Sequence, residues 1–242
     1  MQTRVGPRPY FAGGMKYLPD ELPVCVHAAY QEKGRGQGSN HWHSSSGLNI
    51  LASYAFEPEN LDASRGFYIS KLTALAVLDT LSSYLPAIVI KWPNDLLKNE
   101  KKIAGILIEN SLWGNRIKRS IAGIGVNLNQ EEFPRFDEGL PATSLLLETK
   151  HKVKPEEFLY RLITNLEFRI DQLNDEYTEV IDRDYFSKLY RFGQWGLYKA
   201  GEESFEAMIT GIEEDGHLRL QTREGETRHY AFKEVSFLLT GI

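Results

Sequence analysis

The chain has 242 residues, 42% of them hydrophobic and 25% charged, and 28 Lys and Arg against 33 Asp and Glu give it a formal net charge of −5. This acidic balance argues against a surface built for non-specific binding of nucleic acid or anionic membrane. No apolar run approaches the roughly 20 residues of a membrane span, and residues 1–22 lack the order of a signal peptide. The single cysteine, Cys25, cannot form an internal disulfide, so we expect a cytoplasmic protein.

The first half of the chain alternates strand and helix patterns. Glycines and prolines interrupt residues 1–23, which we expect to be irregular. Residues 24–29 and 48–56 are strand candidates on either side of a Gly-rich polar stretch. Asp62 or Ser64 can cap a helix whose apolar residues continue to Leu81, before Pro86. Residues 88–90 then predict a buried strand that leads into a polar turn.

The second half predicts a hairpin, two helices and a small β unit. Residues 103–112 and 117–128 are β-rich runs joined by a short turn that contains Gly114. Residues 156–173 and 177–192 have the pattern of amphipathic helices. After Gly196, five short alternating runs are typical of a small barrel or sandwich. We therefore predict an α+β fold with a mixed sheet and flanking helices over residues 1–192, and a β unit over residues 193–242.

Three polar or glycine-rich segments are candidate sites. Glycines around Arg35 let backbone N–H groups approach an anion, although a flexible surface turn has the same composition. The turn at residues 91–95 and nearby Lys102 place charged groups at strand ends, where binding sites on sheets tend to lie. The alternative interpretation is an ordinary β-turn with solvated lysines. Gly123 and Gly125 within a strand indicate close approach of a ligand or of another backbone, or a bulge. We expect no metal site, and Cys25 is predicted to be a buried hydrophobe rather than a nucleophile.

Taken in order, these segments resemble the catalytic core of the biotin–protein ligases (biotin–[acetyl-CoA-carboxylase] ligases). The matching residues are Gly34-Arg35-Gly36 with Trp42, then Lys91-Trp92-Pro93-Asn94-Asp95, Lys102-Ile103-Ala104-Gly105-Ile106-Leu107 and Gly123-Ile124-Gly125-Val126-Asn127. The resemblance covers about residues 24–240. It implies a class II aminoacyl-tRNA synthetase-like catalytic fold followed by a C-terminal SH3-like β-barrel. It also implies the short form of the family, without an N-terminal DNA-binding domain, and hence no nucleic-acid partner.

The activity that the resemblance implies has two steps, with ATP and biotin as substrates and Mg²⁺ accompanying ATP. The carboxylate of biotin attacks the α-phosphate of ATP and forms biotinoyl-5′-AMP and pyrophosphate. A lysine of the biotin carboxyl carrier domain of a carboxylase then attacks the adenylate and releases AMP. Two anions meet in the first step, so the site needs fixed cations, and the Gly-rich loop is expected to close over the adenylate. No membrane partner is implied, and the enzyme is expected to be a monomer or a homodimer.

The resemblance also assigns residues by position. Lys102 would hold the reacting carboxylate and phosphate, Asp95 would orient or deprotonate the incoming amine, and Arg35 would contact biotin or the adenylate, which makes these three the catalytic candidates. The substrate-binding candidates are Gln31, Gly34, Gly36, Gln37, Trp42, Lys91, Asn94, Gly105, Gly123, Gly125 and Asn127, with Asn127 on the adenine side.

The sequence departs from the family at two places that bear on biotin affinity. A Ser-Thr-Asn triplet that helps to bind biotin is absent, and the corresponding region contains Tyr10 and Phe11. Gln37 stands where some members carry a second arginine. Two alternatives therefore stay open: a lipoate or octanoate ligase or transferase of the same fold, whose Arg-Arg-x-Ser-Gly-Gly-Gly pattern is absent here, and a non-catalytic protein that binds biotin or a nucleotide.

Overall fold

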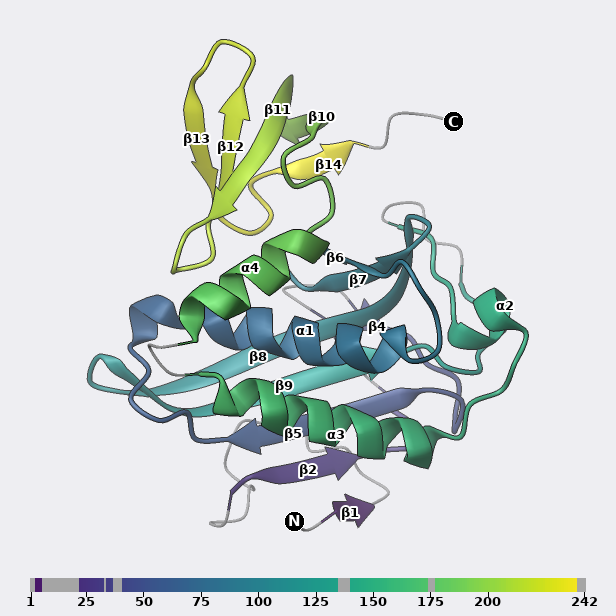
Figure 1. Ribbon diagram of the computed structural model, residues 1–242. Helices are drawn as coiled ribbons and strands as arrows, with labels where there is room; N and C mark the ends of the chain where they lie inside the picture. The colour runs from purple at the N-terminus through teal and green to yellow at the C-terminus, as the bar shows by residue number, and fades with distance from the viewer. Residues whose placement is uncertain are drawn as a thin grey trace.

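A seven-stranded sheet carries most of the chain in this computed structural model, which describes residues 3–5, 22–32, 34–36, 41–134, 140–173 and 177–238. The strand order is β1-β2-β5-β9-β8-β7-β6 (Figure 1). Every neighbouring pair is antiparallel except β1 with β2, so the sheet is mixed, as predicted. Its strands are β1 (Thr3–Val5), β2 (Val24–His27), β5 (Ile50–Phe56), β6 (Val89–Lys91), β7 (Asp95–Lys98), β8 (Lys101–Trp113) and β9 (Arg116–Val126).

The hairpin of β8 and β9 is the centre of this sheet and confirms the sequence prediction. The two strands pair from Ala104 with Val126 to Trp113 with Arg116, and Gly114 at the turn has a φ of +61°. Glycine adopts this left-handed conformation without steric cost. A separate ribbon of β3 (Gly34–Arg35) and β4 (His41–Trp42) lies within the Gly-rich stretch.

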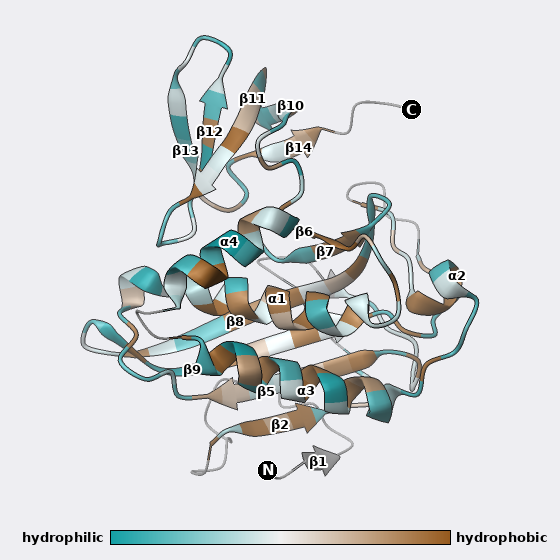
Figure 2. Cartoon of the chain, in the orientation of Figure 1, coloured by the Kyte–Doolittle hydropathy of each residue, from teal (hydrophilic) through white to brown (hydrophobic). Residues whose placement is uncertain are grey.

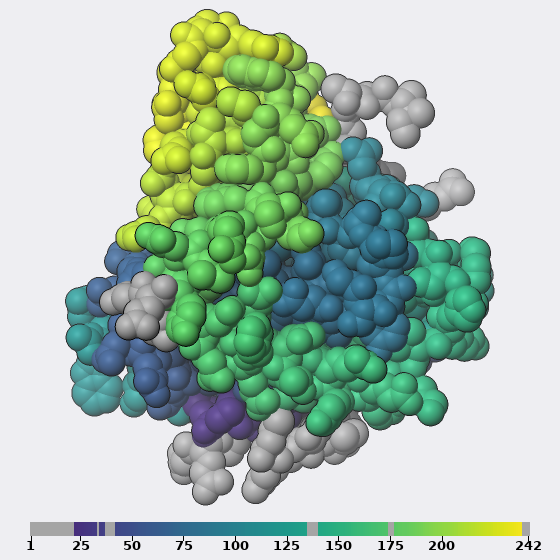
Figure 3. Space-filling model, viewed as in Figure 1, coloured from purple at the N-terminus to yellow at the C-terminus, as the bar shows by residue number. Residues whose placement is uncertain are grey.

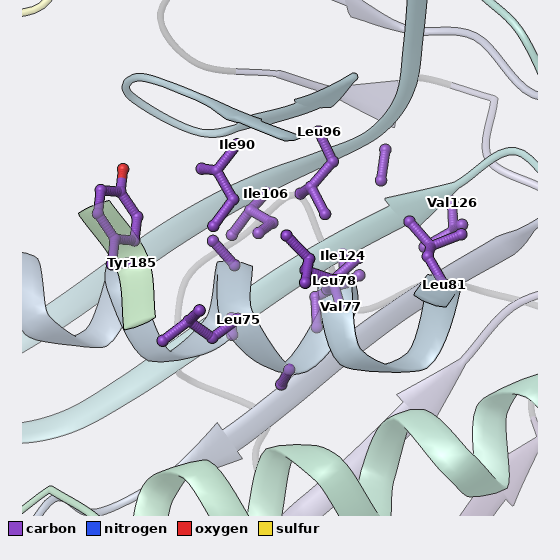
Figure 4. Close-up of a cluster of buried hydrophobic side chains, with 14 of the residues drawn as sticks. Leu75, Val77, Leu78, Leu81, Ile90, Leu96, Ile106, Ile124, Val126 and Tyr185 are labelled. Atoms are coloured by element: carbon purple, nitrogen blue, oxygen red, sulfur yellow. The ribbon is translucent and has the colours of Figure 1, made fainter. Parts of the chain in front are cut away.

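Helix α1 (Phe67–Ser82) is buried on nearly all sides because it lies between the sheet and two outer helices, α3 (Pro155–Asp171) and α4 (Thr178–Lys188). Its inner face packs on the sheet (Figure 4), and the labelled cluster contains Leu75, Val77, Leu78, Leu81, Ile90, Leu96, Ile106, Ile124, Val126 and Tyr185. The predicted start of this helix was wrong. Asp62 makes no side-chain cap and precedes a 3₁₀ turn (Ala63–Arg65), and α1 begins after Gly66.

Two polar networks join the three helices inside this layer. Arg169 of α3 donates to Asp79 of α1 at 2.8 Å and to Asp184 of α4 at 3.0 Å. Lys71, with only 2% of its side chain exposed, pairs with Asp182 of α4 at 2.5 Å. Buried charges need such partners. Hydrophilic residues are visible on the outer sides of α3 and α4 (Figure 2).

The C-terminal residues form a second, five-stranded antiparallel sheet in the order β13-β12-β11-β10-β14. It stands on the end of the helical layer beside α4 (Figure 3). Its strands confirm the five predicted runs, and the predicted division between residues 192 and 193 falls between α4 and β10. The strands are β10 (Trp195–Ala200), β11 (Glu203–Ile212), β12 (Leu218–Thr222), β13 (Thr227–Tyr230) and β14 (Ser236–Leu238).

Two further elements differ from the sequence prediction. Residues 3–5, expected to be irregular, form β1 and pair with β2, because strand pairing stabilises a three-residue segment that has no pattern of its own. Helix α2 (Leu145–Thr149) was not predicted. Its five residues are too few to show a helical period, but Ser144 caps it by accepting a hydrogen bond from the backbone N–H of Leu147.

Candidate active site

One cleft lies on the face of the large sheet opposite the helices. Along β5, Ala52 and Tyr54 point into the helical core, whereas Leu51 and Ser53 line the cleft. Side chains alternate along a strand, so this division of one strand fixes the two faces. Helices α1, α3 and α4 lie in front of the sheet in Figure 1, so the cleft lies on the face of the sheet that is turned away from the viewer. It encloses a volume of about 220 Å³ and is open to solvent.

Most of the residues predicted as functional line this cleft. They come from the Gly-rich loop, from the β6–β7 turn and from strands β8 and β9: Gln31, Arg35, Gly36, Trp42, Lys91, Asn94, Asp95, Lys102, Gly105, Gly123 and Gly125. Gly34 lies beside the cleft, paired with Trp42, where a Cβ would overlap the carbonyl oxygen of Trp42. Gln37 lies outside the described residues.

Asn127 is set back from the cleft. It is buried, with 3% of its surface exposed, and its Nδ2 donates to the carbonyl of Thr143 at 2.9 Å. Its backbone N–H donates to Ile103 of β8. The structure therefore places this side chain in the packing between the end of β9 and the segment that leads into α2.

The central electrostatic feature of the cleft is an ion pair between Lys102 and Asp95. The Nζ of Lys102 lies 2.6 Å from the Oδ1 of Asp95. The register of β7 and β8 shifts between Leu96 and Leu97, which leaves Ile103 as an extra residue on β8. Residues three apart on a regular strand face opposite sides, and this bulge turns Lys102 to the same face as Gly105.

Two paired glycines on neighbouring strands leave part of the floor of the cleft without side chains. Gly125 of β9 pairs with Gly105 of β8 and with Leu51 of β5. The indole of Trp42 lies on this row: a Cβ on Gly125 would come within 2.5 Å of its ring, and one on Gly105 within 3.0 Å. Any side chain at either glycine would displace the indole, which explains why both positions are glycine. The ammonium of Lys102 lies 5.5 Å from the centre of the indole ring.

The turn between β6 and β7 is anchored to β8. The Nδ2 of Asn94 donates to the carbonyl of Ile106 at 2.6 Å, and the N–H of Ile106 donates back to the carbonyl of Asn94 at 2.9 Å. This double contact fixes the backbone next to Asp95. Lys91, at the start of the turn, lies under Phe237 with its Nζ 4.5 Å from the ring centre, and burial lowers the pKa of this lysine.

The C-terminal sheet contributes to the cleft in a way that the sequence did not predict. Phe232, between β13 and β14, lines the cleft, and its ring centre lies 6.3 Å from that of Trp92. The indole N–H of Trp92 donates to the carbonyl of Gly216 at 2.9 Å. No local pattern reveals such contacts, because they depend on how the second sheet packs on the first. The sequence analysis also did not identify Ser53 as a site residue. Its pairing with Gly123 places it on the floor of the cleft.

At the entrance, Arg35 and Glu109 form an exposed pair at 3.5 Å. Within the described ranges, no three His, Cys, Asp or Glu side chains converge as metal ligands. Cys25 is fully buried, and burial raises its pKa to about 12, so its thiol is not a ready nucleophile. Among the helices of the described residues, none is long and apolar enough to cross a membrane.

Comparison with known proteins gives consistent similarities. A sequence profile of the Biotin/lipoate A/B protein ligase family matches residues 9–127. The biotin–[acetyl-CoA-carboxylase] ligase of Paracoccus denitrificans is 32% identical over 205 residues, which cover 83% of this chain and 85% of the relative. The bifunctional ligase/repressor BirA of Bacillus spizizenii is 30% identical over 222 residues, but the match spans 64% of that protein.

Solved structures of similar proteins share this fold. The biotin protein ligase from Aquifex aeolicus, solved with biotin and ATP, superposes with a TM-score of 0.72 at 25% identity, over 91% of this chain and 90% of the other. A biotin protein ligase-like protein of unknown function from a Silicibacter species superposes with a TM-score of 0.65 at 14% identity, which shows the fold alone.

Proposed function

This chain belongs to the biotin/lipoate A/B protein ligase family, among the biotin–[acetyl-CoA-carboxylase] ligases, and from that membership we propose that it activates biotin with ATP and transfers it to a lysine of a carrier domain. One observation carries the proposal. The Gly-rich loop is distant in the sequence from the β6–β7 turn and Lys102, and all three line one cleft. The pairing of Lys102 with Asp95 supplies both a cation and a carboxylate at the same point.

In the first step, the carboxylate of biotin attacks the α-phosphate of ATP, and pyrophosphate leaves. Both reactants are anions, so their approach is unfavourable unless fixed cations offset the repulsion. Lys102 and Arg35 line the cleft and supply this charge, and Lys91 adds a partly desolvated ammonium beside them. A desolvated cation interacts more strongly with a phosphate than one in water does.

Among the described residues, two carboxylates line the cleft, Asp95 and Glu109, and they would hold a Mg²⁺ ion that accompanies ATP; the ion would supply neutralisation of phosphate charge.

In the second step, the amine of a lysine attacks the acyl carbon of biotinoyl-5′-AMP, and AMP leaves. The amine must lose a proton to become a nucleophile. The carboxylate of Asp95 is the group positioned to hold the amine and accept that proton. Because Asn94 fixes the backbone beside it to β8, the carboxylate keeps its place when the carrier domain docks.

The carrier domain is the proposed macromolecular substrate, without a nucleic-acid partner. Arginines of the C-terminal sheet are paired with acids rather than gathered into a basic stripe: Arg219 with Glu213, Arg223 with Glu206 and Arg228 with Glu203. A single cysteine supports a reducing compartment such as the cytoplasm.

Exchange of labelled pyrophosphate into ATP tests this function, because it requires reversible formation of an acyl adenylate. We expect exchange with biotin and none in its absence. Lys102→Ala should abolish most of it, whereas Lys101→Ala, at the exposed neighbouring position, should leave it unchanged. Exchange with lipoate or octanoate but not with biotin would overturn the proposal, and so would the absence of exchange with all three acids.

A further inference from the structure

The floor of the cleft contains a hydroxyl that no described residue bonds. Ser53 on β5 has 7% of its surface exposed, and its Oγ is buried without a hydrogen bond to any residue that the structure describes. The side chain lines the cleft. Buried polar groups are hydrogen-bonded in the great majority of cases, so an unpaired hydroxyl that faces a ligand cleft indicates a bond completed by the ligand.

The described neighbours of Ser53 across the floor of the cleft are glycine and apolar residues. It pairs with Gly123 of β9, which in turn pairs with Leu107 of β8. Leu51 and Ile121 border this row within the cleft lining. The glycine leaves open space between the serine and the leucine. A ligand here therefore lies against the hydrocarbon of these described neighbours and meets the hydroxyl of Ser53.

The position of Ser53 relative to Lys102 sets the length of that ligand. Lys102 is on β8 and Ser53 on β5, with β9 between them. The ammonium of Lys102 lies against Gly105 of β8, two residues along that strand from Leu107, which is level with Ser53. Two strand spacings across the sheet and two residue rises along it amount to a separation of about 12 Å. An acid whose carboxylate lies at Lys102 reaches Ser53 with its far end only if it is extended and several methylenes long. Octanoate and biotin both meet this condition, but octanoate ends in a methyl group and biotin in a cyclic urea.

We propose that Ser53 is a specificity-determining residue: its hydroxyl hydrogen-bonds the polar group at the far end of the acid, the cyclic urea of biotin, so that the cleft favours biotin over a hydrocarbon acid of similar length. This inference rests on the proposed function. It also supplies a polar contact in a chain that lacks the Ser-Thr-Asn triplet.

The test compares two serines of the same sheet. Ser120 of β9 is also fully buried, and its hydroxyl is also unpaired, but Ser120 lies on the helical face with Ala122 and Ile124 and does not line the cleft. Ser53→Ala and Ser120→Ala remove the same atom from the two faces. Pyrophosphate exchange gives KM for biotin, octanoate and ATP, and the rise in melting temperature on adding biotin reports binding without turnover.

We expect Ser53→Ala to raise KM for biotin roughly tenfold, as loss of one hydrogen bond in a desolvated site does. It should leave KM for octanoate and ATP within twofold and reduce the thermal shift produced by biotin. Ser120→Ala should change none of these values. Ser53→Cys keeps nearly the size of the side chain but forms only weak hydrogen bonds, so it should show the same selective rise in KM for biotin. This variant replaces Ser53→Ala in the test if the alanine variant is unstable.

Three results would overturn the inference. An unchanged KM for biotin in Ser53→Ala would show that the hydroxyl does not contact the acid. Equal weakening toward biotin and octanoate would show a purely structural role. A wild-type protein that neither exchanges with biotin nor is stabilised by it would contradict the proposed function and the inference together, whereas the first two results leave the proposed function intact.

Discussion

Lys102 and Asp95 meet across neighbouring strands because β8 contains one extra residue. Their charged atoms lie 2.6 Å apart, and the register shift at Ile103 turns the lysine to the cleft face. In a regular strand, Lys102 and Gly105 would lie on opposite faces of the sheet. The bulge therefore gives the cleft a cation beside its bare glycine floor, and both steps of the proposed reaction depend on this placement.

Removing the cation should affect the first step most. Lys102→Ala is expected to slow adenylate formation by on the order of 10² or more, the usual effect of deleting one preorganised charge that stabilises a transition state. Single-turnover release of pyrophosphate measures this step. A wild-type rate of adenylate formation in the variant would show that Lys102 does not stabilise this step.

Asp95→Asn should separate the two steps. The amide keeps nearly the same size but cannot accept the proton of the incoming amine, so transfer should fall more than adenylate formation. Transfer is followed from preformed biotinoyl-5′-AMP to a carrier domain, and adenylate formation by pyrophosphate release. Equal losses in both steps would count against the proposed role of Asp95.

Gly125 is expected to be required for activity because a side chain at this position would collide with the indole of Trp42. A methyl group at this position would lie 2.5 Å from the indole, so Gly125→Ala is expected to displace the ring and lower activity by on the order of 10². The same change in a Trp42→Ala background should have little further effect. Additive losses in the double variant would show that Gly125 acts independently of the indole.

Trp92 should join the two sheets. Trp92→Phe keeps the aromatic packing on Phe232 but removes the bond to the carbonyl of Gly216, and we expect it to lower the free energy of unfolding by about 1 kcal/mol. Urea denaturation measures the change. Unaltered stability would mean that water satisfies the Gly216 carbonyl equally well.

Cys25 should be inert in the native protein. With its pKa raised to about 12, only about one thiol in ten thousand is ionised at pH 8, and the side chain is 1% exposed. Iodoacetamide should therefore label it only after denaturation and leave activity unchanged in the native enzyme. Because the folded pKa is raised above its ordinary value of 9.0, this group favours the folded state below pH 9 and loses that effect as the pH rises toward 12. Rapid labelling at pH 8 without unfolding would contradict the burial.

Long periodic segments could be predicted from sequence, and short or tertiary-dependent ones could not. The β8–β9 hairpin and helix α3 have many residues that repeat one pattern, and both appear where expected. The three residues of β1 and the five of α2 have no period to read. The start of α1 was placed too early because Asp62 has the chemistry of a cap without its geometry.

For the site, the order of residues predicted which ones to consider but not how they meet. Gly123 and Gly125 within a strand predicted close approach of a ligand or of another backbone, and both residues line the cleft. The bulge at Ile103 and the approach of Phe232 depend on register and on packing between sheets, which no local pattern encodes. Ser53 looks like any other residue of a buried strand until its pairing with Gly123 is known.

The proposed activity attaches biotin, rather than another acid, to a carrier lysine. Intact-mass and peptide mass spectrometry of a biotin carboxyl carrier domain, incubated with the enzyme, ATP and equal concentrations of biotin, lipoate and octanoate, distinguishes these outcomes. We expect a single biotin adduct on one lysine, dependent on ATP and lost with Lys102→Ala. An octanoyl or lipoyl adduct, or an unmodified carrier after adenylate has formed, would overturn the proposed activity.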